Sequence, residues 1–144
     1  MRRGSVRSAG AGGRRGHALV ELALVLPLLA FMLIAVFDFG RAFNYSITVA
    51  TCARNGALYE SDLSYRSKSG FSNVTEAALK DAGGLSPTPT VSSTNGTDSS
   101  GDAYVEVTVT YPFAMISRYP GFSNPLSIRR TVRMRTIHLT PDTS

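Results

Sequence analysis

The sequence from His17 to Asp38 reads HALVELALVLPLLAFMLIAVFD, in which Glu21 is the only Asp, Glu, Lys or Arg residue before Asp38. The apolar run covers about 21 residues and would form a helix of roughly 31 Å, close to the hydrocarbon thickness of a bilayer. We therefore expect a transmembrane helix over residues 17–38. Pro27 removes one backbone donor inside this helix and should kink or loosen it locally.

The segment before this run, residues 1–16, holds five arginines and no acidic residue, while the other ten Lys and Arg residues balance the ten Asp and Glu residues. The segment therefore carries the whole net charge of +5. A stretch of Gly, Ser, Ala and Arg cannot bury a core, so we expect a disordered basic leader. Because basic flanks stay in the cytoplasm, the N-terminus should lie inside and residues 38–144 outside. The neutral remainder argues against a nucleic-acid-binding surface.

Three interpretations of this N-terminal signal compete. A secretory signal peptide is disfavoured, because the apolar core is long and no Ala-x-Ala cleavage site follows it. An uncleaved signal anchor fits the length but leaves Glu21 unexplained, since a carboxylate near the apolar entrance is costly unless it finds a partner. A prepilin-type signal explains more: Gly16 has no side chain, so a peptidase can approach its backbone closely.

The residues around Gly16 carry a family resemblance. Arg14, Arg15 and Gly16, followed by His17 and by Glu21, resemble the processing site of type IV pilin-like proteins. The longer string through residue 29, together with FDFGRA at 37–42 and ARNGA at 53–57, is similar to the TadE-like family. Its members are minor pseudopilins of the tight-adherence (Flp/Tad) pilus machinery.

The resemblance implies a structural role and no enzymatic activity, cofactor, metal or small-molecule substrate. It implies cleavage by a prepilin peptidase between Gly16 and His17, in the bacterial inner membrane. Glu21 would then be the fifth residue of the mature chain and would pair with an N-terminal amine, its own or a neighbour's. Pro27 would bend the helix to fit an assembly. The implied partners are the prepilin peptidase, other pilin-like subunits, the Tad platform proteins and the lipid bilayer.

Beyond the membrane, apolar residues continue at three- and four-residue steps. They are Phe39, Phe43, Ile47, Ala50, Ala53 and Ala57. This spacing predicts an amphipathic extension over residues 39–60, so that one helix runs from His17 to Tyr59 and packs this stripe against the rest of the protein. Cys52, the lone cysteine, is most simply a small residue of that helix.

The remaining residues, 61–144, predict a small extracytoplasmic α+β domain with about three antiparallel strands. The clearest strand is 104–111, because Val105, Val107, Val109 and Tyr111 alternate with polar residues before Pro112 ends the run. The other expected elements are a loop over 61–72, a short helix over 73–82 that begins at the N-cap Asn73 with Glu76 three residues later, and strands over 91–94 and 128–139. The fold class is therefore α+β, a long N-terminal helix followed by a small sheet.

Two polar groups in this domain were weighed as binding sites. Asp98 and Asp102 lie in a polar loop that offers oxygen ligands for Ca²⁺, although without EF-hand spacing. Arg129, Arg130, Arg133 and Arg135 form a basic cluster on the last expected strand. A charged edge strand that resists aggregation explains the cluster most simply, and docking to an acidic partner or to DNA is the alternative.

No catalytic constellation is evident, because His17 and His138 should lie on opposite sides of the membrane and Cys52 has no obvious base. The sequence therefore favours a TadE-like minor pseudopilin, a membrane-anchored component of a Tad pilus. The alternative is an uncleaved single-pass membrane anchor that presents an extracytoplasmic binding domain.

Overall fold

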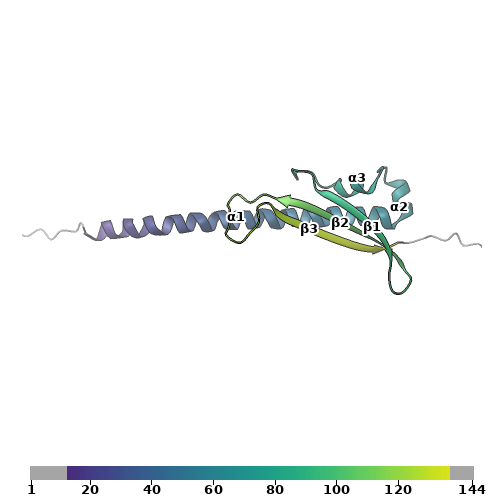
Figure 1. Ribbon diagram of the computed structural model, residues 1–144. Helices are drawn as coiled ribbons and strands as arrows, with labels where there is room; N and C mark the ends of the chain where they lie inside the picture. Colours follow the sequence, from purple (N-terminus) through teal and green to yellow (C-terminus); the bar gives the residue numbers. More distant parts are fainter. Residues whose placement is uncertain (1–12, 137–144) are drawn as a thin grey trace, which may run out of the picture. The chain divides into compact units, whose positions relative to one another are not determined.

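The computed structural model describes residues 13–136 and contains two units, one ending at Phe37 and the other beginning at Asp38. Helix α1 (Gly13–Ser61) belongs to both units (Figure 1). It begins before the predicted start at His17, so the last residues of the leader are helical. Once an apolar helix has nucleated, each further residue adds one hydrogen bond, which favours such an extension. The expectation of disorder for residues 1–12 lies outside the described residues.

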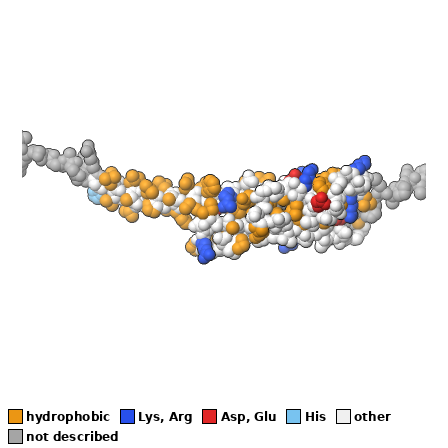
Figure 2. Space-filling model, turned by 90° about the horizontal axis from the view of Figure 1, so that it is seen from above, with side chains coloured by type: hydrophobic (Ala, Val, Ile, Leu, Met, Phe, Trp, Pro, Cys, Tyr) orange, Lys and Arg blue, Asp and Glu red, His pale blue; other side chains and the backbone are white. Residues whose placement is uncertain are grey.

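In the first unit, α1 exposes apolar side chains along its whole described length. Figure 2 shows these hydrophobic side chains along the helix. The helix is long and apolar enough to cross a membrane, and none of its most apolar window is buried within the chain. Leu24 and Leu33 are 75% and 72% exposed. Such a continuous apolar surface requires lipid or another protein to cover it. Pro27 lies inside α1 and does not end it.

The second unit holds a three-stranded antiparallel sheet in the order β1-β2-β3 (Figure 1). Its strands are β1 (Thr90–Thr97), β2 (Ala103–Phe113) and β3 (Leu126–Arg135). The central strand β2 pairs Val107 with Ser93 of β1 and with Val132 of β3. The predicted α+β fold, a long helix followed by a small antiparallel sheet, is confirmed.

The core of this unit lies between β2 and the second half of α1. The predicted inward face of β2 is buried, and Phe113 extends it. Its helix partners are Val49, Cys52, Ala53 and Ala57, all 0% exposed. At Gly56 the packing is closest, because an added Cβ would lie 3.0 Å from Val107 Cγ1 and 3.1 Å from Ala78 Cβ. The helix therefore meets the sheet through small side chains.

The predicted apolar stripe of this helix is wrong in its first half. Phe39, Phe43 and Ile47 are 75%, 63% and 54% exposed. The buried face instead includes Tyr45 and the small residues around Gly56. Ala53 and Ala57 lie at the margin common to both faces, and the centres of the two faces differ by roughly a quarter turn at 3.6 residues per turn. The face with small residues is the buried one because small side chains let the sheet approach the helix backbone.

The short helices only partly match the prediction. Helix α3 (Val74–Leu79) is capped as predicted, since Asn73 Oδ1 accepts from Glu76 N at 2.9 Å, while Glu76 Oε2 accepts from Ser72 N at 2.8 Å. The loop expected over 61–72 is wrong, because it contains helix α2 (Leu63–Lys68). The carboxylate of Asp62 caps α2 by accepting from the backbone N–H groups of its first turn.

The strand boundaries also differ from the prediction. Strand β2 continues through Pro112, which was expected to end it. Because β1 reaches only to the partner of Thr110, Pro112 lies where β2 has a single neighbouring strand, and such positions tolerate a missing N–H. Strand β1 extends to Thr97 and β3 begins at Leu126. The predicted end of the last strand, residues 137–139, lies outside the described residues.

Candidate functional site

The predicted processing residues lie at the start of α1. Arg14, Arg15, Gly16 and His17 are all helical, and the first turn contains no acidic residue. Positive residues near the positive end of a helix dipole, together with glycine in the helix, lower helix stability. The backbone around Gly16 is therefore in a weakened turn of α1, and a peptidase needs an accessible backbone.

The fold gives no reason for a glycine at position 16. An added Cβ there would meet no atom within 4 Å, and Gly16 has no positive φ. The same is true of Gly40, an exposed glycine farther along α1. A requirement for glycine at position 16 would therefore come from a partner rather than from packing within the chain.

The two predicted assembly residues, Glu21 and Pro27, are exposed on α1. Glu21 lies one helical turn from His17, on the same face. Within residues 16–136, for which side chains are described, no hydrogen bond or ion pair of the Glu21 carboxylate is formed. Its surroundings on α1 are the exposed side chains of Leu22 and Leu24.

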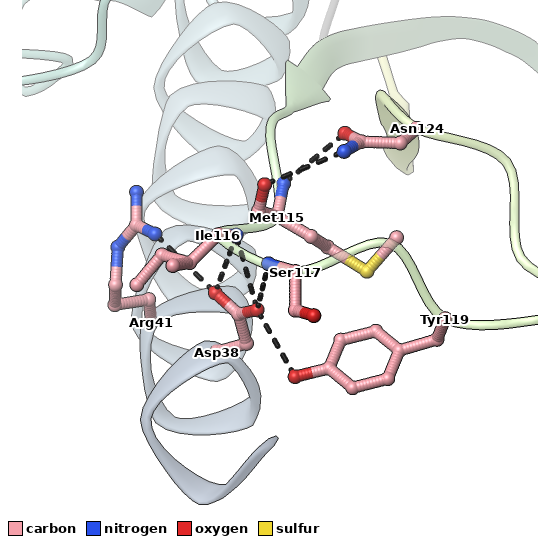
Figure 3. Close-up of polar contacts among 7 residues, drawn as sticks. All are labelled: Asp38, Arg41, Met115, Ile116, Ser117, Tyr119 and Asn124. Carbon is pink, nitrogen blue, oxygen red and sulfur yellow. Dashed lines mark hydrogen bonds and ion pairs between the residues drawn. The ribbon is translucent and has the colours of Figure 1, made fainter. Parts of the chain in front are cut away.

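A different carboxylate, that of Asp38, forms the most extensive polar site of the second unit (Figure 3). Asp38 is only 4% exposed. Its two oxygens accept from Ile116 N at 3.0 and 3.1 Å, and its Oδ2 accepts from Ser117 N at 3.3 Å. The hydroxyl of Tyr119 donates to Oδ2 at 3.3 Å. Burial and the Asp38 carboxylate raise the pKa of Tyr119, which keeps this hydroxyl protonated as a donor.

These bonds hold the β2–β3 loop, residues 114–125, against α1. Asn124 closes the loop from its other end: its Oδ1 accepts from Met115 N at 3.2 Å, and its Nδ2 donates to Met115 O at 3.4 Å (Figure 3). Gly121, at φ 86°, supplies the left-handed backbone of a turn in which Phe122 N donates to Tyr119 O. The loop is therefore fixed at both ends.

The guanidinium of Arg41 completes the site beside Asp38. Its Nη1 lies 3.4 Å from Asp38 Oδ1, a pairing that their three-residue spacing on one helix face allows. Its Cζ lies 5.2 Å from the ring centroid of Phe113. Tyr45 packs edge-on against both Tyr111 and Phe113, with ring centroids 5.4 and 5.6 Å apart. The Asp38 carboxylate is buried and both of its oxygens are engaged by these donors, so the site acts as a structural anchor.

The other polar candidates are engaged within the chain. Arg135 Nη2 lies 2.6 Å from Asp102 Oδ2 and 3.6 Å from Asp98 Oδ2. Asp98 Oδ1 also accepts from the backbone of Ser100 and of Asp102 at 2.9 Å. Among the described residues, no group of three or more His, Cys, Asp or Glu side chains is placed to hold a metal ion. The two aspartates therefore stabilise a turn.

The arginine cluster of β3 is divided among several partners. Arg133 Nε lies 3.5 Å from Glu106 Oε2, and its guanidinium carbon lies 3.7 Å from the Tyr104 ring centroid. Arg130 donates to Ser46 Oγ on α1. Because β3 is an edge strand, these charges fit the simpler interpretation, a charged edge.

Cys52 is not placed as a reactive thiol in this structure. Cys52 is buried in the core, and burial, with the nearby Asp81, raises the pKa of its thiol. A neutral buried thiol is a poor nucleophile. His138 lies outside the described residues.

Comparison with known proteins finds a similarity in the N-terminal part of the chain. A family model described as TadE-like protein matches residues 16–58, which confirms the resemblance predicted from the sequence. No curated protein and no solved structure matches the chain. The matched residues contain Gly16, Glu21, Pro27 and Asp38, and they end within α1.

Proposed function

Because residues 16–58 are TadE-like, we propose that this protein is a minor pseudopilin of a tight-adherence (Flp/Tad) pilus system. The TadE-like segment and the long apolar helix together fit a membrane-anchored, pilin-like component. The observation that carries the proposal is the exposed apolar surface of α1 in the first unit, because such a helix requires a bilayer and then the helices of other subunits as its surroundings.

In this proposal a prepilin peptidase removes residues 1–16 at the cytoplasmic face. The weak first turn of α1 lets the backbone at Gly16 enter the peptidase cleft, and Arg14 and Arg15 keep it on the cytoplasmic side. The protein then remains in the inner membrane as a single-pass protein, with the second unit outside. Its partners are the peptidase, other pilin-like subunits and the Tad platform proteins.

Glu21 is the proposed assembly residue. A carboxylate without a partner near the apolar boundary is costly, and the new α-amine of His17 on a neighbouring subunit would supply the missing charge. This pairing would set how far one subunit is displaced along the next. Pro27 would adjust the path of the helix in the assembly.

Replacing Glu21 tests this assignment. Glu21→Ala should still be inserted and cleaved, yet surface pili should be largely lost when this variant is the sole copy in the cell. Glu60→Ala, on the same helix but in the second unit, is the control and should support normal piliation. Normal piliation by Glu21→Ala would remove the proposed assembly role.

A further inference from the structure

We propose that the β2–β3 loop, residues 114–125, is a second membrane contact that rests on the outer surface of the bilayer crossed by α1. Its exposed apolar side chains would enter the headgroup region, and nearby arginines would bind the phosphates of anionic phospholipids. The inference rests on the proposed membrane anchoring and adds to it a contact that holds the second unit at the membrane.

The loop is held at the residue that follows the apolar run. Ile116 and Ser117 bind the Asp38 carboxylate directly, and Asp38 is the next residue after Phe37. Whatever angle the apolar segment takes in the bilayer, a loop bonded to Asp38 remains within a few ångströms of the end of that segment. Covalent connection therefore places the loop at the membrane surface.

The loop exposes two large apolar side chains. Ile116 is 61% exposed and Phe122 is 65% exposed. Scattered exposed apolar residues are ordinary. Here, however, Phe39 and Phe43 of α1, exposed near the same end of the unit, line an open groove together with Ile128, Arg129 and Arg130 of β3. The apolar surface of α1 thus continues onto the second unit at this end.

The charges at this end favour anionic lipid headgroups over a neutral surface. Four arginines lie here, in the loop or beside it, and Asp38 is the one acidic residue among the described residues of this end, with both oxygens engaged. The arginines are Arg41, Arg118, Arg129 and Arg130. The other described acidic side chains of the unit are at the far end of α1, at the N-cap of α2, on α3 or just after it, or in the β1–β2 turn and the adjoining β2.

Exposed apolar side chains flanked by arginines are typical of a segment that lies in the membrane interface, where the long cationic side chains reach the lipid phosphates. A protein partner would have to displace lipid from a position next to the end of the span. The bilayer is therefore the occupant that the location and the charge favour, and a second copy of the chain is the alternative that the experiment below separates.

The test uses the full chain with Cys52→Ala, reconstituted in vesicles of phosphatidylethanolamine and phosphatidylglycerol, with one spin label at a time. Labels are placed at Ser123 in the loop, at Ser100 in the β1–β2 turn and at Leu33 in the apolar run. Each label is measured for collision with dissolved oxygen, which concentrates in lipid, and with a water-soluble nickel chelate. We expect the ratio of oxygen to nickel collisions to be several-fold higher at Ser123 than at Ser100.

The double variant Ile116→Ser with Phe122→Ser should lower the ratio at Ser123 to that at Ser100, while leaving Leu33 protected. The double variant Arg118→Glu with Arg129→Glu should partly lower the ratio of oxygen to nickel collisions at Ser123. This decrease should be smaller when the vesicles are made of phosphatidylcholine. Equal ratios at Ser123 and Ser100 with Leu33 protected would overturn the loop contact alone. An unprotected Leu33 would instead overturn the membrane anchoring. Protection at Ser123 that disappears when the protein is diluted in lipid would assign the surface to a second copy and also overturn the proposal.

Discussion

The two parts of helix α1 differ in what covers their apolar side chains. From Leu22 to Phe37 the helix is apolar on every side, and none of its most apolar window is buried within the chain. From Asp38 to Ser61 it instead buries one face of mostly small residues against its own sheet. A helix that is hydrophobic all round is made for lipid or for other helices, and a helix with one apolar stripe is made for a single packed partner. The first part therefore takes its partners from outside the chain.

The two carboxylates of α1 show the same contrast. Asp38 is buried and its oxygens accept from the β2–β3 loop, while Glu21 is exposed. A buried carboxylate whose oxygens accept hydrogen bonds stabilises its own fold. An exposed carboxylate in an apolar segment is available to a neighbour. Experiments can test this difference between the two parts of α1.

Removing the Asp38 carboxylate should have the largest effect on the second unit. Asp38→Ala leaves the N–H groups of Ile116 and Ser117 without acceptors, and we expect a loss of about 3 kcal/mol in the free energy of unfolding. Glu21→Ala should leave this free energy unchanged. Urea unfolding of the full chain in detergent, followed by tyrosine circular dichroism, measures both. Equal stability of the two variants would contradict the anchor role of Asp38.

Filling the space at Gly56, where the helix approaches the sheet most closely, should have the second-largest effect on stability. Gly56→Val places methyl groups where Val107 Cγ1 and Ala78 Cβ lie 3.0 and 3.1 Å from a new Cβ, and overpacking of this kind costs about 2 kcal/mol. Gly40→Val, where an added Cβ meets nothing within 4 Å, is the matched control and should change stability little. The same urea experiment compares them, and an equal cost at both positions would show that helix propensity rather than packing sets the effect.

Two aromatic residues can test which face of α1 packs against the sheet. Tyr45 packs on Tyr111 and Phe113, so Tyr45→Ala should lower the free energy of unfolding by about 1.5 kcal/mol. Phe43 is 63% exposed, and Phe43→Ala should stay within about 0.5 kcal/mol of the parent chain. A larger loss at Phe43 than at Tyr45 would restore the stripe expected from the sequence.

The smallest effect concerns the turn between β1 and β2. The backbone N–H of Asp102 is the largest cause that lowers the pKa of Asp98 below its ordinary 3.8, and the N–H of Ser100 and the nearby Arg135 act in the same direction. Because the folded pKa lies below the unfolded one, this stabilisation is present above about pH 4 and is lost as the pH falls through the lowered value.

Amide hydrogen exchange at Ser100 and Asp102, measured across this acid range, should therefore show a local loss of protection as Asp98 becomes protonated. Asp98→Asn should reduce the pH dependence of that protection. A turn whose protection responds equally to acid in both chains would exclude Asp98 as the group responsible.

Repetitive patterns made parts of this fold predictable. The apolar run of α1, the alternation from Val105 to Tyr111 and the cap at Asn73 each depend on spacing within a few residues, which a sequence displays directly. The TadE-like resemblance also rests on local motifs, from Gly16 onward. The helix, the inward face of β2 and the TadE-like resemblance of residues 16–58 could therefore be predicted without the structure.

The parts that were missed depend on distant or competing partners. The donors to Asp38 from the β2–β3 loop lie 78 or more residues along the chain, and no local pattern marks Ile116 or Ser117. The stripe was misplaced because α1 is apolar on two faces, and the side-chain sizes demanded by the sheet decided between them. Helix α2 was missed although Asp62, an N-cap residue followed by Leu63, was its available signal.

The mature N-terminus is the most direct test of the proposal that the first part of α1 is a processed assembly segment. The parent chain, Gly16→Val and Gly40→Val would each be expressed with an active prepilin peptidase, and intact mass and N-terminal sequence would be determined from the membrane fraction. We expect His17 to be the first residue of the parent and of Gly40→Val, and the leader to remain on Gly16→Val. A parent chain that keeps its leader beside an active peptidase would contradict the account and favour an uncleaved single-pass anchor.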